Sequence, residues 1–311
     1  MSQRYWNKKV LLAKIETTYG TDPTPTGAAN AILATNVKLS PMEGQDVARE
    51  LERPFFGADA TLPADLHAKL SFRVELAPSG TAGTAPAWAP LVRACGCAQT
   101  IVAGTSVTFN PITDAAESAT LHFHYDGIRH RLRGARGNFK MMVEASGIPY
   151  LEFEFWGLFE AATDVANPTP TLTAFQDPVV ANVANTPVFT IDGVALVLRS
   201  FSFDAGAKVE PRFLIGSESI LMTGREEKIE ARIEARTMAI FNPYTRAQVA
   251  GRMPIVLQHG ASAGRRATLN VPLAQIQRPG GVEQQQNIAE WPLSFVPQQN
   301  AGNDQWTLAL T

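Results

Sequence analysis

Apolar and polar residues alternate without interruption between residues 66 and 76. The apolar positions are Leu66, Ala68, Leu70, Phe72, Val74 and Leu76. The polar positions between them are His67, Lys69, Ser71, Arg73 and Glu75. A period of two is typical of a β-strand with one face in the core and one face in water. We therefore predict a two-faced strand over this segment.

The same pattern returns at residues 228–235. Its apolar positions are Ile229, Ala231, Ile233 and Ala235, and its polar positions are Lys228, Glu230, Arg232 and Glu234. The stretches 53–76 and 212–235 align without a gap, at a constant offset of 159 residues from Arg53 to Arg212. The identical pairs are Arg53/Arg212, Gly57/Gly216, Leu62/Leu221, Lys69/Lys228, Arg73/Arg232 and Glu75/Glu234. One chain therefore carries the same motif twice.

A helical signal follows each of these strands. Residues 85–97 place Trp88, Leu91, Val92 and Cys95 on one helical face and end at a glycine. Residues 242–251 begin with the N-cap residue Asn242 followed by a proline, and they also end at a glycine. The predicted repeat is thus a two-faced strand, a turn, a short helix and a glycine.

The remaining apolar periodicity predicts further strands in both halves. In the first half they are 10–16, 32–39 and 47–51 around a turn at 41–45, 118–125, 128–132, 139–144 and 150–159. In the second half they are 254–259, 267–277, 288–296 and 305–310. Residues 163–187 contain four prolines and read as a linker, with one short strand near 179–183.

These elements predict a mainly β fold with two similar domains. We expect two tandem β-sandwich or barrel domains, each with one short helix, at residues 1–162 and 188–311, joined by the linker 163–187. A chain of 311 residues with 45% hydrophobic and 18% charged residues is globular and long enough for two domains. Its net charge of −2 argues against tight nucleic-acid binding. No signal peptide or membrane-spanning run is recognisable, so we expect a soluble protein made in the cytoplasm.

Candidate catalytic and metal-binding residues are few, and each fits a structural role better. Residues 260–264, GASAG, match a nucleophile elbow around Ser262, but the following RRATLNVPL is strand-like where the elbow needs a helix. His122, His124 and His130 could hold a metal, yet no carboxylate or cysteine completes the set nearby. Cys95 and Cys97, the only cysteines, read as small buried residues. We therefore predict no enzyme activity, no metal and no cofactor.

The opening of the chain resembles a known family. Residues 11–57, and above all KIETTYGTDP at 14–23, are similar to the phage tail tube (major tail) proteins of long, non-contractile tails. In that family each domain is a β-sandwich with a flanking helix, and six domains form a ring whose strands join around a lumen. Stacked rings make a tube through which DNA passes at ejection. The resemblance implies a structural protein of the virion tail, synthesised in the host cytoplasm.

The resemblance also gives the duplication a purpose. Two domains in one chain could occupy alternate places in one ring, so that three chains close a pseudo-hexameric ring; a ring of six chains is the alternative. The partners implied are other copies of the chain, the tail tip proteins, the tail terminator or neck proteins, and a tape-measure protein and DNA that pass through the lumen without specific binding. No membrane partner is implied. An alternative function is a β-sandwich virion decoration or receptor-binding module, and a further one is a hydrolase using Ser262.

Two sets of residues are the candidate site. The polar strand positions would line the lumen or form inter-domain contacts; they are Lys69, Ser71, Arg73, Glu75, Lys228, Glu230, Arg232 and Glu234. Ring stacking requires protruding segments, for which 17–31, 41–64 and 202–224 are the candidates. Their apolar tips are Phe55, Phe56, Leu214 and Ile215. The competing interpretation is that each hairpin folds onto its own domain.

Overall fold

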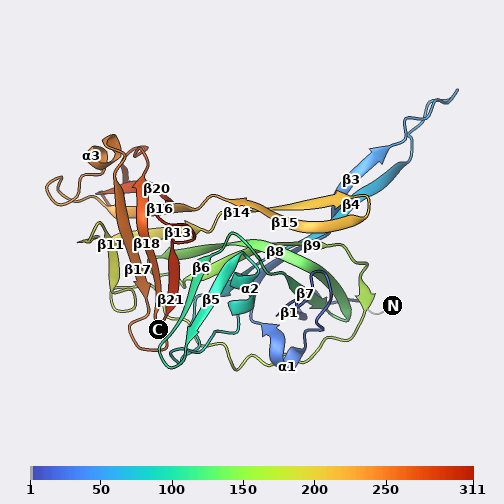
Figure 1. Cartoon of the computed structure of the whole chain (residues 1–311), viewed down its shortest axis with the longest axis horizontal. Helices are drawn as coiled ribbons and strands as arrows, with labels where there is room; N and C mark the ends of the chain where they lie inside the picture. The colour runs from blue at the N-terminus through green and yellow to red at the C-terminus, as the bar shows by residue number, and fades with distance from the viewer. Residues whose placement is uncertain (1–2) are drawn as a thin grey trace.

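The computed structural model describes residues 3–311 and is mainly β-sheet (Figure 1). The helices are short: α1 Gly27–Asn30, α2 Ala89–Arg93 and α3 Pro243–Gln248. None of the helices in residues 3–311 has the length and apolar character needed to cross a membrane. The mainly β prediction is confirmed, with one more short helix, α1, in the first half than the sequence pattern indicated.

The first half of the chain forms two packed layers that share one long strand. One layer contains β1 Lys9–Ile15, β2 Ala31–Ile32, β7 Ala119–Tyr125, β10 Thr163–Asp164 and the start of β8 Ile128–Glu144. The other contains β3 Thr35–Ala48, β4 Thr61–Glu75, β9 Tyr150–Leu158 and the rest of β8. A hairpin of β5 Cys97–Val102 and β6 Ser106–Pro111 follows α2.

The second half has its own set of strands. One group is β11 Val188–Ile191, β12 Val194–Ala195, β17 Arg252–His259, β18 Ala267–Ile276 and β21 Thr307–Leu310. Another is β13 Leu198–Asp204, β16 Lys228–Glu234, β19 Glu283–Gln285 and β20 Ile288–Pro297. Between β13 and β16 a separate hairpin is formed by β14 Ala207–Leu214 and β15 Ser217–Arg225.

The strand pairings of the first half recur in the second. Six pairings of the first half each have a counterpart in the second. β1–β2 corresponds to β11–β12, β1–β7 to β11–β17, and β7–β8 to β17–β18. In the same way β8–β9 corresponds to β18–β20, β4–β9 to β16–β20, and β3–β4 to β13–β16. The 159-residue offset holds within this scheme, because Leu70 of β4 faces Phe155 and Ile229 of β16 faces Phe295. The two-faced strands β4 and β16 therefore have equivalent neighbouring strands. The exact domain boundaries stay a prediction.

The two halves are joined by strand pairing at two places. Residues 140–144 of β8 pair with Ser200–Asp204 of β13, and β21 pairs with β6. All strands except β14 and β15 consequently belong to one 19-stranded sheet. The chain is therefore one body in which the sheet of the first half continues into that of the second.

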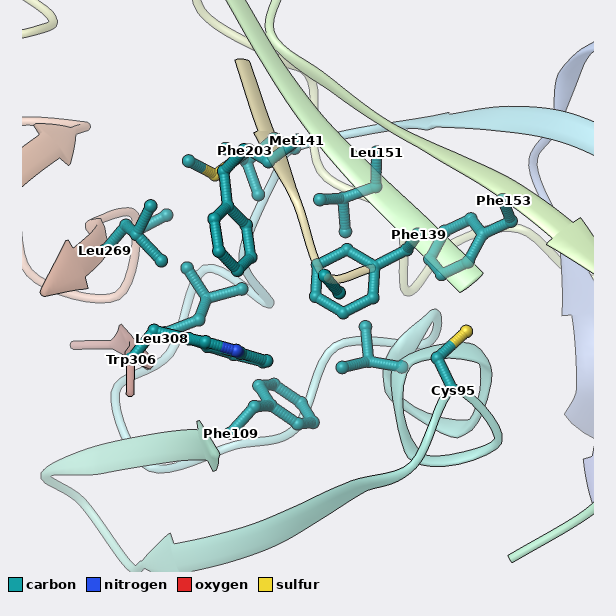
Figure 2. Close-up of a cluster of buried hydrophobic side chains, with 14 of the residues drawn as sticks. Cys95, Phe109, Phe139, Met141, Leu151, Phe153, Phe203, Leu269, Trp306 and Leu308 are labelled. Atoms are coloured by element: carbon teal, nitrogen blue, oxygen red, sulfur yellow. The ribbon is translucent and has the colours of Figure 1, made fainter. Parts of the chain in front are cut away.

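A single hydrophobic core runs through both halves (Figure 2). At its centre the ring of Trp306 lies 5.8 Å from that of Phe139 and 5.1 Å from that of Phe203, both in edge-on geometry. These three side chains are 0–1% exposed. Phe139 belongs to the first half and the other two to the second, so removing any one of them weakens the packing of both.

Several strand boundaries differ from the prediction. The turn predicted at 41–45 is wrong, since β3 runs unbroken from Thr35 to Ala48 and pairs with β4. Register shifts on either side of Glu43 accommodate Pro41 and Gly44 within the ladder. The strands predicted at 128–132 and 139–144 are likewise one strand, β8, with a register shift between Arg133 and Arg136.

The helices are confirmed in place but are shorter than predicted. Asn242 caps α3, its side chain accepting hydrogen bonds from the backbone N–H groups of Tyr244 and Thr245 at 3.1 Å each. α2 ends at Arg93, and Cys97 already begins β5. The short strand predicted near 179–183 is wrong, because residues 179–181 have no regular secondary structure and residues 182–183 form a bend and a turn. The β5–β6 hairpin was not predicted.

Candidate functional site

The predicted polar strand residues lie on one face of the continuous sheet. Directly opposed residues in a sheet point to the same side. One row of them crosses the whole molecule, through Arg73, Glu152, Lys140, Asp204 and Lys228. The two copies of the motif therefore share one surface, which we call the polar sheet face. It comprises the outward positions of β4, β9, β8, β13, β16 and β20.

Charged side chains on the polar sheet face are largely paired within the chain. Arg73 Nε lies 3.2 Å from a carboxylate oxygen of Glu152, and Lys140 Nζ lies 3.0 Å from one of Asp204. The hydrogen bond to Asp204 raises the pKa of Lys140, which stays charged. Exposed pairs of this kind contribute about 0–1 kcal/mol each to stability. Their main consequence is a hydrated surface with its charges internally compensated.

The second copy of the motif is paired in the same way. Lys228 Nζ lies 2.5 Å from Glu230, and Arg232 lies 2.9 Å from Glu283. Arg232 also pairs with the buried carboxylate of Glu290. In the first copy Lys69 stands over the ring of Trp156 at 4.1 Å instead.

Acidic residues outnumber basic ones on the polar sheet face. The acidic residues are Glu75, Glu144, Glu152, Glu154, Asp204, Glu230, Glu234 and Glu290, and the basic ones are Lys69, Arg73, Arg136, Lys140, Lys228 and Arg232. Arg199, at the bulge of β13, adds a further basic side chain that pairs with Glu290. The sequence reasoning missed the acidic residues of β9, although Glu152 and Glu154 alternate with apolar residues in YLEFEFWGLF. It also placed His67 on the wet face. His67 is only 8% exposed, because its ring stacks on Trp156 at 5.3 Å and lies 6.3 Å from that of Phe213 in β14.

The four predicted apolar tip residues are exposed at the ends of two long hairpins. Phe55 and Phe56, between β3 and β4, are 84% and 111% exposed. Leu214, the last residue of β14, and Ile215, which follows it, are 53% and 108% exposed. The β3–β4 hairpin projects away from the body of the molecule, whereas the β14–β15 hairpin lies along β8 and β9 (Figure 1). Two segments with matching sequence thus have different surroundings.

The β14–β15 hairpin is seated on the first half of the chain by specific contacts. Ile220 is fully buried; its backbone N–H donates to Tyr19 Oη at 2.6 Å, and its carbonyl accepts from Arg136 Nη1 at 2.8 Å. Arg225 Nη2 donates to the carbonyl of Gly96 at 2.7 Å. Burial raises the pKa of Tyr19, which keeps its proton. The hairpin therefore folds onto its own chain, but onto the opposite half.

A family model for the phage tail tube protein matches residues 6–289, nearly the whole chain. The chain belongs to the phage tail tube protein family. A search of curated proteins gives no significant match. The match confirms the resemblance seen in residues 11–57 and assigns the protein a structural role in the virion tail. Tail tube proteins are structural proteins rather than enzymes, and they assemble with themselves and with other tail proteins.

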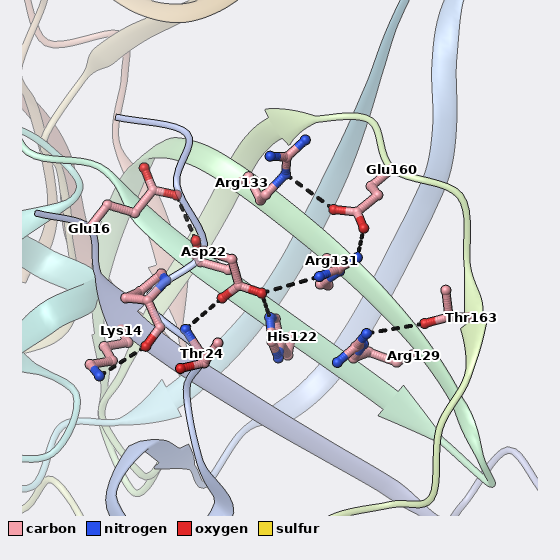
Figure 3. Close-up of polar contacts among 12 residues, drawn as sticks. Lys14, Glu16, Asp22, Thr24, His122, Arg129, Arg131, Arg133, Glu160 and Thr163 are labelled. Atoms are coloured by element: carbon pink, nitrogen blue, oxygen red, sulfur yellow. Dashed lines mark hydrogen bonds and ion pairs between the residues drawn. The ribbon is translucent and has the colours of Figure 1, made fainter. Parts of the chain in front are cut away.

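In this tail tube protein the loop 17–31 is held against the sheet instead of projecting (Figure 3). Asp22 accepts from His122 Nε2 at 3.0 Å and from Arg131 at 3.4 Å, and Glu16 accepts from the N–H of Gly20 at 2.7 Å. Burial acts to raise the pKa of Asp22, but hydrogen bonds from Thr24 N–H and His122 outweigh it and hold the pKa below its usual value. We therefore do not retain this loop as a stacking segment.

The residues weighed for catalysis or metal binding have structural surroundings. Ser262 lies in the turn between β17 and β18, and strand β18 follows where a nucleophile elbow needs a helix. His130 stacks on Tyr125 at 5.7 Å, while His122 bonds Asp22. Residues 3–311 contain no group of three or more side chains that could hold a metal ion.

The two cysteines of the tail tube protein are buried and free. Burial raises the pKa of the Cys95 thiol well above its usual value and that of Cys97 to about 12. Neither thiol ionises appreciably near neutral pH, so neither is a reactive nucleophile.

Proposed function

We propose that three copies of this chain close a pseudo-hexameric ring, and that stacked rings form the wall of a conduit for DNA ejection. The observation that carries the proposal is the β8–β13 pairing, which joins the sheets of the two halves edge to edge. If an equivalent strand pairing joins each chain to the next, the polar sheet face becomes continuous around the ring.

One of the two strand edges needed for this pairing between chains is the outer edge of β3. The counterpart of β13 in the first half is β3. Lys38 of β3 faces Ser71 and Ser202 of β13 faces Glu230, and Ser71 and Glu230 are related by the 159-residue offset. Within residues 3–311, no strand pairs with the outer edge of β3. An unpaired edge of this kind is a template for another strand.

The complementary edge lies at the end of the second half. Gly137 of β8 and Ile276 of β18 are counterparts, since they face Phe155 and Phe295. The segment 277–285, which continues β18 into β19, therefore corresponds to the part of β8 that pairs with β13. β3 of one copy then pairs with segment 277–285 of the next. This contact is heterologous, and rotation closes it into a ring of definite number.

The polar sheet face suits the lumen wall. Its excess of acidic side chains repels the phosphates of DNA, which favours passage over binding. Arg73, Lys140 and Lys228 already have carboxylate partners in their own chain, so they do not need a neighbouring subunit to compensate them. A tape-measure protein would occupy the same lumen before DNA does. The alternative, in which this face packs against a neighbouring domain, would bury those pairs at a cost in desolvation.

The exposed apolar tips suit contacts along the tube axis. Phe55, Phe56, Leu214 and Ile215 would meet the next ring, or the tail tip and terminator proteins at the two ends. Burying apolar side chains that a monomer exposes favours association by about 25 cal/mol per Å² of buried surface.

Electron microscopy of the purified protein tests this function. We expect rings or tubes with a central hole, and an isolated ring with three times the 33.6 kDa mass of the chain. Particles of fixed size without an axial cavity would instead fit a decoration or receptor-binding module and would overturn the proposal. A mass of six chains would retain the tube and reject the trimer.

A further inference from the structure

The seated β14–β15 hairpin covers the C-terminal end of α2. A Cβ atom placed on Gly96 would lie only 2.5 Å from Met222 Sδ, and Arg225 bonds the Gly96 carbonyl. Ala94 and Cys95, which directly follow the helix, are completely buried. One hairpin thus closes over one helix end in the first half.

The corresponding helix end in the second half is uncovered. α3 follows the second copy of the two-faced strand as α2 follows the first. The carbonyl of Gly251 after α3 accepts from Ile276 N, as that of Ala94 after α2 accepts from Gly137 N. Val249, the C-cap residue at this end, is 71% exposed. The first half buries the residues at the corresponding end of α2, whereas Val249 is left open to solvent.

The β3–β4 hairpin has the complementary surface. Its side chains Met42, Val47 and Leu62 are 53%, 51% and 58% exposed. Leu62 is identical to its counterpart Leu221 on the seated hairpin. Figure 1, in which the longest axis of the molecule is horizontal, shows this hairpin and α3 at opposite ends. The two uncovered surfaces can therefore meet only between copies.

We propose that the β3–β4 hairpin of one copy lies across the second half of a neighbouring copy and covers the C-terminal end of its α3. The 159-residue offset sets the register along the hairpin. Pro63 takes the place of Met222 at the C-terminal end of the helix, and Leu62, the counterpart of Leu221, lies next to Val249. Gln275 is the counterpart of Arg136, because they face Val296 and Trp156, and its amide donates to the carbonyl of Thr61. The inference rests on the proposed ring for its neighbour and adds the residues that join the two.

Cross-linking between engineered cysteines tests the contact. The test uses a double variant that carries both Leu62→Cys and Val249→Cys. When tubes of this variant are treated with a short bis-maleimide, we expect cross-linked dimers and trimers on a denaturing gel. Either single variant should stay monomeric, since Cys95 and Cys97 are 0–1% exposed. Tubes that give no ladder would overturn the hairpin contact and leave the ring standing. Wild-type protein that makes no rings or tubes would overturn the proposed function instead.

A second variant keeps the test decisive if the cysteine pair assembles poorly. Val249→Glu places a charge in the proposed contact and should raise the critical concentration for assembly at least tenfold. Val249→Leu retains an apolar side chain and should leave it unchanged. Because Val249 is exposed in the single chain, neither change should alter the midpoint of urea unfolding. Equal assembly of Val249→Glu and wild type would contradict the inference.

Discussion

The two long hairpins share a sequence motif but differ in what they contact. The β14–β15 hairpin is fixed to the first half by Ile220, Tyr19 and Arg136, whereas the β3–β4 hairpin extends into solvent. The difference originates in the surface beneath each hairpin. Tyr19 belongs to the long connection between β1 and β2, and β11 and β12 are joined only by the Asp192–Gly193 turn. Duplication preserved the strands, and divergence of one loop left a single hairpin with a seat in its own chain.

This contrast separates stability from assembly. Residues of the seated hairpin contribute to the folding of the monomer. Their counterparts on the free hairpin should contribute only when copies meet. Substitutions at matched positions can therefore tell the two roles apart.

The largest expected effect is at the anchor of the seated hairpin. Ile220→Ala should lower the free energy of unfolding by about 2–5 kcal/mol, because it opens a cavity at a fully buried site. Its counterpart Thr61→Ala, at an exposed site, should change the free energy by less than about 0.5 kcal/mol. Urea unfolding of both variants measures the difference. Equal effects would mean that the hairpin is not seated as described.

Acidic pH should have the next largest effect on the free energy of unfolding, mainly through His124 in the first half. Burial lowers the pKa of His124 to about 4, so between pH 6.5 and 4 the unfolded chain binds more protons than the folded one. Stability therefore falls as the pH drops through that window, by about 2 kcal/mol at pH 5 from this group. Urea midpoints at pH 7.5 and 5.0 measure the loss. His124→Gln should reduce it, and an unchanged pH dependence in that variant would contradict the assignment.

The guanidinium beneath the seated hairpin should have a smaller effect. Arg136→Ala removes hydrogen bonds to the carbonyls of Ile220 and Ala116 and should cost about 1–2 kcal/mol. Gln275→Ala, the matched change in the second half, should cost less than about 1 kcal/mol in the monomer. Thermal unfolding of the two variants ranks them. A larger loss for Gln275→Ala would reverse the comparison.

The smallest effect on stability is expected at the free hairpin tip. Phe55→Ser with Phe56→Ser should change unfolding by less than about 0.5 kcal/mol, because both rings are exposed. The same variant should form fewer or shorter tubes in electron micrographs if the tips join rings. Normal tube length in this variant would remove the tips from the stacking contact.

Local alternation predicted most of the sheet, and non-local contacts account for what it missed. The period of two located β4, β16 and β9 within a few residues. Bulges concealed the continuity of β3, since a register shift breaks the alternation that marks a strand. Nothing near Tyr19 in the sequence indicates that its hydroxyl meets Ile220, and the two are brought together only by the fold. The polar residues of the repeat were found by pattern, but their shared face depends on the β8–β13 pairing.

A density map of the assembled tube tests the ring most directly. The account predicts three chains in each ring, pseudo-sixfold symmetry in cross-section, and the side chains of Arg73 and Lys228 on the wall of the central channel. Six chains in a ring, or a polar sheet face on the outside of the tube, would contradict it.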